Sequence, residues 1–216
     1  MSPTDDAATL AALGTSLGLS LTPAQTDALL KFMDLLERWN KTYNLTAVRT
    51  RAGMWTQHLA DCLAVVAPLL AVLPQGRVLD VGSGGGLPGV VIAICAPSLS
   101  VSCVDAVAKK AAFVRQVAGE LDLPNLLSLH GRVEVLRTTP FDLVTSRAFA
   151  SLSDFVRWTQ HLLTPRGYWL AMKGKSPDVE WATLPRHVEV FHVEQLKVPR
   201  LDAQRCLVWM RRTAPL

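Results

Sequence analysis

The sequence predicts an α/β fold, in which a mostly parallel, twisted β-sheet carries helices on both faces and follows an N-terminal helical cap. Three observations indicate this fold. The first seventy-odd residues have helical periodicity, short β-rich runs alternate with helical stretches from Arg77 onward, and a dense glycine turn follows the first of these runs. Strands that alternate with helices build βαβ units, which form parallel sheets.

The cap is predicted to span residues 1–74. Thr22 and Gln25 have the spacing of a capping box and Pro23 takes the first helical position, so one helix should run from Pro23 to about Lys41. Its apolar residues recur every three or four positions, which gives this helix one broad face to bury.

A second helix is expected over Ala52–Leu73, broken or kinked near Pro68 because proline lacks the N–H that a helix interior needs. The segment Pro74–Gly76 marks the boundary with the second part, residues 75–216. With 216 residues in all, we expect the two parts to form one compact unit.

The second part contains the predicted sheet. Parallel strands are expected at residues 78–81, 101–105, 126–129, 141–145 and 168–172, and the helices between them at 88–96, 107–121 and 153–163. The last two β-rich runs, 187–193 and 205–211, suit an antiparallel pair at the edge of the sheet.

Composition narrows the class of protein. The formal net charge is +4, and residues 77–216 carry 17 basic against 12 acidic side chains, which is compatible with a polyanionic partner but weak evidence for one. Asp5 and Asp6 stand where a secretory signal would be positive, and the longest apolar run, Leu63–Leu73, falls short of the roughly 20 residues that cross a bilayer. We therefore expect a cytoplasmic protein without a membrane span.

The four cysteines lie far apart, with no CxxC pair and no His/Cys cluster at zinc spacing. No metal site is predicted, and the thiols should be reduced and mostly buried.

A glycine loop, Gly82–Gly86, directly follows Asp80 and precedes a helix that should begin at Pro88. Open α/β sheets bind ligands at such strand ends. Five glycines in eight residues are more than a tight turn needs, and they let a ligand approach the backbone. The loop therefore predicts a nucleotide-like ligand, with Gly82 and Gly84 among its contacts.

Two ligands fit the loop. Gly84–Gly89 satisfies the GxGxxG pattern of dinucleotide sites, and Asp105 lies about 20 residues further on, so an NAD-dependent oxidoreductase stays open. Asp80 favours S-adenosylmethionine, because a carboxylate there would repel a pyrophosphate but suits an ammonium and a sulfonium group. The preferred interpretation is a methyltransferase that uses S-adenosylmethionine.

In this interpretation Asp105 accepts hydrogen bonds from both ribose hydroxyls, the alternative being a helix N-cap. The segment Gly131–Glu134 follows the third strand and could flank the adenine. The adenine amine would then donate a hydrogen bond to the backbone or to the Glu134 carboxylate. A plain start of a surface helix is the alternative for this segment.

Three segments resemble the RsmG (GidB) family of bacterial 16S ribosomal RNA (guanine-N7)-methyltransferases: Asp80–Gly89, Ser146–Ala150 and Trp39–Thr46. The resemblance covers roughly residues 35–175 and implies a Rossmann-like class I methyltransferase that makes 7-methylguanosine at guanine 527 of 16S RNA. It differs from the family pattern at Cys62, where we expect serine, and at Gly85, where proline is common. By the resemblance, the methyl donor contacts fall on Gly82, Leu87, Val133, Glu134 and Arg147.

Guanine N7 has a free lone pair, so its methylation needs no general base and depends on positioning. The fourth strand ends in Thr145-Ser146-Arg147. It lacks the Asn-Pro-Pro-Tyr type of segment that holds an exocyclic amine in enzymes that methylate such amines. Arg147 is the one candidate for a catalytic role, through the donor, a phosphate or a guanine edge. A salt bridge to a neighbour such as Asp142 is the alternative.

Candidates for RNA contact are basic or stackable side chains on several elements. Basic side chains could follow RNA phosphates as a group, and Tyr43 could stack on an unpaired base. These candidates are Lys109, Lys110, Arg115, Lys173, Lys175, Tyr43 and Asn44.

Asn40, His58 and Asp61 complete a polar set in the cap, which could equally lock the cap onto the sheet. The partner would be small-subunit ribosomal RNA, naked or in a ribosomal particle. A small-molecule methyltransferase, or one that acts on another RNA, stays open.

Overall fold

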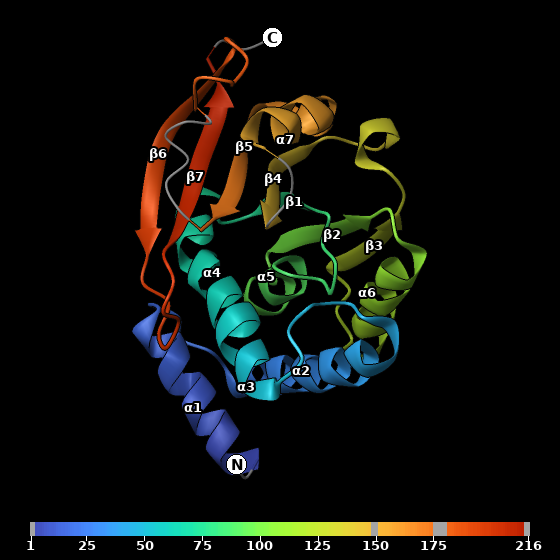
Figure 1. The fold of residues 1–216 in the computed structure, drawn as a ribbon, viewed down its shortest axis with the longest axis vertical. Helices are drawn as coiled ribbons and strands as arrows, with labels where there is room; N and C mark the ends of the chain where they lie inside the picture. Colours follow the sequence, from blue (N-terminus) through green and yellow to red (C-terminus); the bar gives the residue numbers. More distant parts are fainter. Residues whose placement is uncertain (1–2, 148–150, 175–180, 214–216) are drawn as a thin grey trace.

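A twisted β-sheet forms the centre of the molecule in the computed structural model, which describes residues 3–147, 151–174 and 181–213 (Figure 1). Within these residues seven strands pair in the order β3-β2-β1-β4-β5-β7-β6. The strands are β1 (Gly76–Val81), β2 (Leu99–Asp105), β3 (Leu126–His130), β4 (Phe141–Arg147), β5 (Leu163–Lys173), β6 (Val188–Leu196) and β7 (Arg205–Arg212).

Strands β1 to β5 pair in parallel, and β7 pairs antiparallel with both β5 and β6. The predicted strands and the antiparallel pair are confirmed. Chain order does not give the position of β7, which lies inside the sheet between β5 and the edge strand β6.

Helices precede the sheet and connect its strands. The described α-helices are α1 (Pro3–Ser16), α2 (Pro23–Tyr43), α3 (Arg51–Met54), α4 (Asp61–Val72), α5 (Gly89–Cys95), α6 (Ala108–Glu120) and α7 (Leu152–Thr159). A π-helical turn, η1 (Trp55–Ala60), joins α3 to α4, and 3-10 turns occur at η2 (Val133–Val135) and η3 (Gln160–Leu162).

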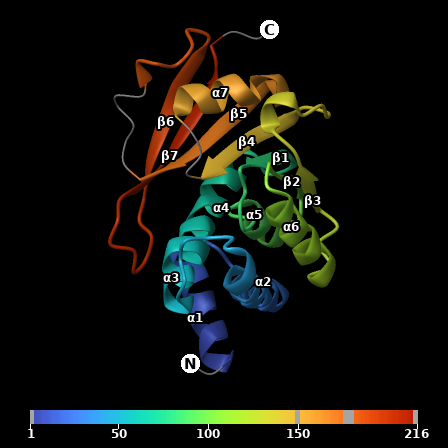
Figure 2. The same ribbon diagram turned by 45° about the vertical axis from the view of Figure 1, so that its right-hand side comes forward.

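The two faces of the sheet are covered unequally. One hydrophobic core joins residues of α2, α4, α5 and α6 to one face, and a smaller core places α7 and η2 on the other, as the turned view shows (Figure 2). Helices on both faces are therefore confirmed. The cap and the sheet share the larger core, whereas the boundary at residues 74–75 stays a prediction.

The capping box predicted for α2 is present. Thr22 Oγ1 accepts from the backbone of Gln25, whose side chain accepts from Thr22 N in return. The Gln25 amide also donates to Ile94 O and Cys95 O at the end of α5, so one residue both starts α2 and fixes it to the next layer. At its other end α2 stops at Asn44, which adopts the left-handed conformation with φ 52°.

The break predicted near Pro68 is wrong, because α4 continues through this residue to Val72. Val65, Val66 and Leu69 around it are fully buried, and this packing compensates for the hydrogen bond that proline lacks. The irregularity lies earlier, in the π-helical turn η1, which the periodicity did not reveal. Helix α1 was also not predicted as a separate element.

By length and composition alone, the stretch Arg51–Val72 could cross a membrane. In this fold, however, 56% of that apolar window is buried inside the molecule, as in the core helix of a globular protein. Near its middle lies Asp61, which is buried and paired with arginine side chains.

Candidate functional site

The glycine loop lies at the carboxyl ends of β1 and β2. Gly82 N and Ser83 N donate to Val104 O at 2.9 and 3.2 Å, which ties the loop to β2. Gly82, Gly84 and Gly86 have φ between 56° and 77°, a backbone conformation that residues with a side chain rarely adopt. The sequence therefore uses glycine here for backbone geometry and for access to the loop.

Asp80, on β1, is completely buried below this loop. Its Oδ2 accepts from Gly89 N at 2.8 Å, at the start of α5, while its Oδ1 has no hydrogen-bond partner among the described residues. Burial raises the pKa of Asp80 to about 7, although the Gly89 hydrogen bond and the charge of Arg147 oppose that rise. Asp80 thus offers a buried, unused acceptor.

Gly89 is needed where α5 meets β1. A Cβ at this position would lie 2.3 Å from Cys103 Sγ and 2.9 Å from Asp80 Oδ2. Helix α5 begins here, one residue after the predicted Pro88, which acts as the N-cap.

Asp105, at the end of β2, is buried and joins two loops. Its Oδ2 accepts from Gly84 N at 3.0 Å and its Oδ1 from Val107 N at 2.9 Å, just before α6. The second contact matches the helix-start alternative, but a carboxylate has about four acceptor sites. Both oxygens therefore keep capacity for a ligand hydroxyl.

The segment predicted to flank an adenine forms η2. Val133 is buried, and Glu134 is held by Arg132, whose NH2 group lies 3.2 Å from Glu134 Oε1. A hydrogen bond from its own backbone N–H, and next the bond from Arg132, hold the pKa of Glu134 below its usual value.

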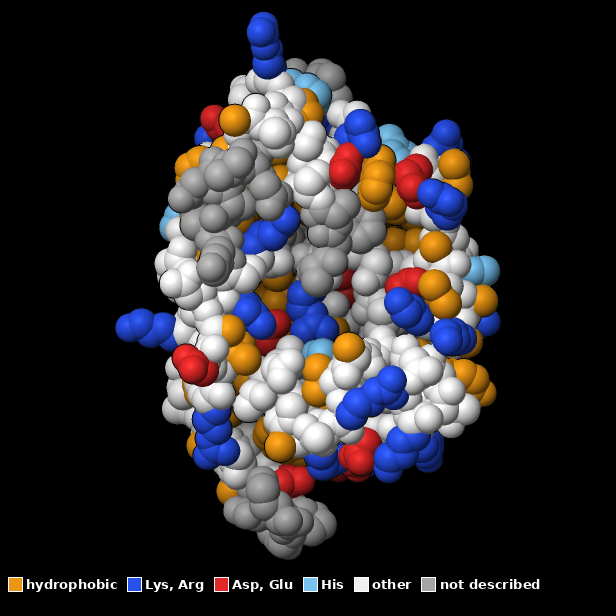
Figure 3. Space-filling model, in the orientation of Figure 1, with side chains coloured by type: hydrophobic (Ala, Val, Ile, Leu, Met, Phe, Trp, Pro, Cys, Tyr) orange, Lys and Arg blue, Asp and Glu red, His pale blue; other side chains and the backbone are white. Residues whose placement is uncertain are grey.

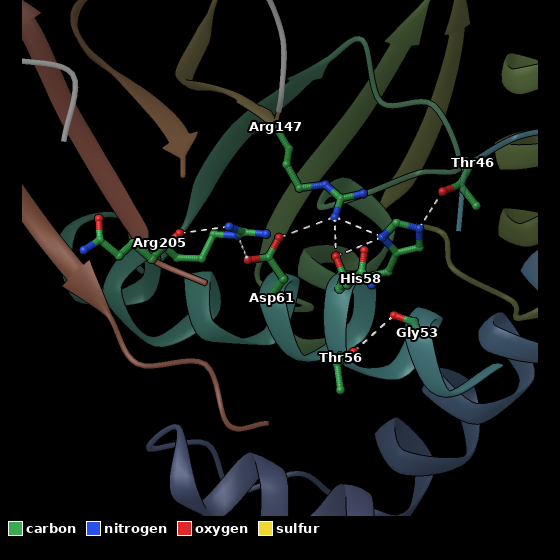
Figure 4. A network of polar contacts seen from close by, with 9 residues as sticks. Thr46, Gly53, Thr56, His58, Asp61, Arg147 and Arg205 are labelled. Atoms are coloured by element: carbon green, nitrogen blue, oxygen red, sulfur yellow. Dashed lines mark hydrogen bonds and ion pairs between the residues drawn. The ribbon is translucent and has the colours of Figure 1, made fainter. Parts of the chain in front are cut away.

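Arg147 extends from the end of β4 to the cap (Figure 4). Its NH1 group lies 2.8 Å from Gln57 O, 3.1 Å from His58 Nδ1 and 3.4 Å from Asp61 Oδ2. The alternative, a salt bridge to a neighbour, is present, but its partner is Asp61 and not Asp142, which instead accepts from the backbone N–H of Arg77 at 2.9 Å.

Asp61 holds a second arginine. Its Oδ1 accepts from Arg205 Nε at 3.0 Å, and only 3% of its side chain is exposed. Arg205 begins β7 and was missed in the sequence, since no local pattern links it to a residue 144 positions earlier. His58 and Asp61 of the predicted polar set therefore contact arginines from the sheet, and these contacts connect cap and sheet.

His58 is neutral in this network. Burial, and next the charge of Arg147, lower its pKa to about 4. Its Nε2 lies 2.6 Å from Thr46 Oγ1. Its Nδ1 lies 2.9 Å from Gln57 O and 3.1 Å from Arg147 NH1, so a neutral ring either donates to the carbonyl from Nδ1 or accepts there from Arg147, and Nε2 contacts Thr46 in both tautomers.

The segment after α2 lies beside the glycine loop. Asn40 is buried and shapes this segment, because its Oδ1 accepts from Thr46 N and its Nδ2 donates to Val48 O. Leu45 is buried, and its Cβ would lie 4.0 Å from a Cβ placed on Gly85. The Tyr-Asn-Leu-Thr segment thus reaches the candidate site.

The structure separates the predicted RNA contacts. Lys109 and Arg115 are exposed on α6, and Lys110 Nζ lies 3.8 Å from Asp105 Oδ2. Lys173 ends β5, and Lys175 lies outside the described residues. Lys and Arg side chains surround the hollowed middle of one face, with acidic and histidine side chains between them (Figure 3).

The four cysteines are free thiols, three of them buried and Cys95 partly so. In the part of the chain that the structure describes, no three His, Cys, Asp or Glu side chains gather as a metal site would require.

Comparison with known proteins gives a family. The model described as "GidB: rRNA small subunit methyltransferase G" matches residues 25–208. Proteins named ribosomal RNA small subunit methyltransferase G from Acidovorax sp. (strain JS42) and from Polaromonas sp. (strain JS666) are 57% and 58% identical. The matches cover 92% of this chain and 92% of the Acidovorax protein, and 91% and 89% for the Polaromonas protein.

Solved structures with a similar fold include proteins described as methylases and methyltransferases. Ribosomal protein L11 methylase from Lactobacillus delbrueckii subsp. bulgaricus has a TM-score of 0.56 at 15% identity, over 73% of this chain and 79% of that one. TrmN from Thermus thermophilus has 0.55 at 19%, over 70% of this chain and 48% of that one, so the chain spans about half of its length. The predicted Rossmann-like methyltransferase fold is confirmed.

Proposed function

Because the chain belongs to the GidB family, rRNA small subunit methyltransferase G, we propose that it transfers a methyl group from S-adenosylmethionine to N7 of a guanosine in 16S ribosomal RNA. By resemblance the target is guanine 527. The observation that carries the choice of donor is the buried Oδ1 of Asp80 beside the glycine loop, which has no partner in the described part of the chain.

The Asp80 site fits a cationic ligand better than a dinucleotide. A buried carboxylate with a free oxygen gains from an approaching ammonium or sulfonium group, and it would repel a pyrophosphate. The raised pKa of Asp80 has the same cause, since nothing in the described protein fully compensates its charge. We therefore expect binding of the donor to lower this pKa and to release protons near pH 7.

The other predicted donor contacts surround the same loop. Gly82, Gly84 and Leu87 would offer backbone groups, Asp105 would accept from the ribose hydroxyls, and η2, with Val133 and Glu134, would lie against the adenine. Arg147 would complete the site from β4, held by the cap.

The reaction needs orientation rather than a proton acceptor. When bound, the donor would supply an electrophilic methyl group, and N7 of guanine, whose lone pair carries no proton, would take it as the methyl–sulfur bond breaks and S-adenosylhomocysteine leaves. Arg147 cannot swing freely, because Gln57 O and Asp61 Oδ2 of the cap hold one of its nitrogens beside the His58 ring, so it can present its other N–H groups to the site in a fixed direction. Asp61 balances its charge, which limits repulsion of the cationic donor.

The test has two parts. Calorimetry with S-adenosylhomocysteine and NAD in parallel should show binding of the first alone, in an amount that depends on buffer ionisation near pH 7. Purified protein is then incubated with labelled S-adenosylmethionine and either naked 16S RNA or small subunits from a strain that lacks the modification. Label at guanine N7 is expected with at least one of them.

If the protein binds NAD but not S-adenosylhomocysteine, the assignment of S-adenosylmethionine as the methyl donor is wrong. Binding of S-adenosylhomocysteine with no label in either RNA sample would favour a small-molecule methyltransferase instead. Label in naked RNA alone, or in subunits alone, would identify the true partner. A ribosomal substrate also agrees with the predicted cytoplasmic location.

A further inference from the structure

Aromatic rings form a row from the core to the surface at the end of α2. Phe113 of α6 is fully buried and lies 5.4 Å from Trp39, measured between ring centroids, and Trp39 lies 4.8 Å from Tyr43. Tyr43 is 42% exposed. The core thus supports an exposed ring that has little freedom to move.

A guanidinium group is fixed next to this ring. Asn44 follows Tyr43 and ends α2 in the left-handed conformation, and its Oδ1 accepts from Arg49 NH1 at 2.7 Å. Arg49 is exposed, and no acidic side chain of the described residues pairs with it. An arginine held by a neutral amide keeps its full charge for an anion.

The ring lies close to the candidate site. Thr46 lies three positions after Tyr43, so the Cα atoms of these two residues are at most about 11 Å apart. Thr46 contacts His58, which in turn contacts Arg147. A nucleotide beside the target guanosine could therefore reach Tyr43 while the guanine occupies the site.

We propose that Tyr43 and Arg49 form a docking site for an unpaired nucleotide next to the methylated guanosine, in which Tyr43 stacks on the base and Arg49 binds a phosphate. This inference rests on the proposed function and adds the place where the RNA strand is held. Sequence-specific RNA recognition favours unstacked bases on aromatic rings, and arginine binds phosphate through paired donors. The site would act on RNA affinity, because neither residue touches the glycine loop in any described contact.

The test compares the KM for RNA, kcat and the affinity for S-adenosylhomocysteine across variants. Tyr43→Ala should raise the RNA KM about 5-fold or more, because base stacking on an aromatic ring is worth about 1–3 kcal/mol. Tyr43→Phe keeps the ring and should stay within about twofold of the wild type. Arg49→Ala should also raise KM and should reduce the slope of log affinity against log salt by about 0.7 for one phosphate.

The matched control is Phe191 of β6, another exposed ring with an arginine nearby, since the guanidinium carbon of Arg211 lies 4.9 Å from its centroid. Phe191→Ala should leave the RNA KM unchanged. An equal rise in KM for Phe191→Ala, or a Tyr43→Ala variant with wild-type KM, would overturn the proposal. So would a matching loss of affinity for S-adenosylhomocysteine in Tyr43→Ala.

The docking site and the proposed function can fail separately. Direct binding is therefore also measured, by fluorescence anisotropy of a labelled single-stranded fragment of 16S RNA. If the wild type methylates no RNA but Tyr43→Ala still binds this fragment about 5-fold more weakly, the reaction is wrong and the docking site stands. If the wild type and Tyr43→Ala bind this fragment equally well, the proposed docking site is wrong.

Discussion

Two charged regions flank the glycine loop, and the protein holds them in different ways. Between cap and sheet, the charges of Asp61, Arg147 and Arg205 are largely buried and joined to one another. On α6, Lys109 and Arg115 are exposed and have no described ion pair. Residues of the same chemical type therefore have different tasks, since the first group fixes geometry and the second can only add positive potential.

The largest expected effect comes from breaking the buried network. Asp61→Ala removes the only described carboxylate partner of two arginines, and leaving a buried charge unpaired costs about 3–5 kcal/mol. Urea unfolding should show this loss. The matched control is Glu189→Ala, which removes the partner of Arg211 on the exposed part of β7 and should cost no more than about 1 kcal/mol. Equal losses in both variants would contradict the contrast.

A smaller, pH-dependent effect should come from His58. Its pKa in the folded protein is lowered to about 4. Between about pH 4 and 6.5, His58 is therefore protonated in the unfolded chain but neutral in the folded protein. This group's contribution to stability is therefore complete above pH 6.5 and is lost as the pH falls toward 4. In His58→Gln, unfolding free energies measured from pH 4 to 8 should lack this component.

Exposed His192 of β6 provides the control, since His192→Gln should leave the pH profile of stability unchanged. Asp80 acts in the opposite direction, because its raised pKa makes ionisation costly as the pH rises toward 7, but it is present in all three proteins and cancels in their comparison. A profile of His58→Gln parallel to that of the wild type would contradict a neutral, buried His58.

The smallest effect is expected on α6. Replacing Lys109 and Arg115 together by alanine should change the unfolding free energy by less than about 0.5 kcal/mol, because both side chains are exposed. RNA affinity should weaken mainly at low salt, and the salt slope should fall by up to about 0.9 for each cation that contacts a phosphate. An unchanged slope would show that α6 faces away from the RNA.

Local signals in the sequence predicted local features well. Thr22, Pro23 and Gln25 predicted the start of α2, and the spacing of glycines after Asp80 predicted the loop, because capping and turn geometry depend on neighbours in the chain. The partner of Asp61 could not be predicted, since Arg205 meets it only after the antiparallel end of the sheet has formed. Tertiary packing also explains why Pro68 does not break its helix, because the burial of its neighbours outweighs one lost backbone hydrogen bond.

The place of β7 inside the sheet also has a consequence for synthesis. Among the described strands β6 pairs with β7 alone, yet β6 leaves the ribosome first, so both of its edges are unpaired until β7 follows. The ion pair between Asp61 and Arg205 is delayed longer, because Arg205 is made 144 residues later, on the order of 10–30 s at typical rates of translation. A nascent chain therefore has its glycine loop well before Arg205 completes the ion pairs of Asp61.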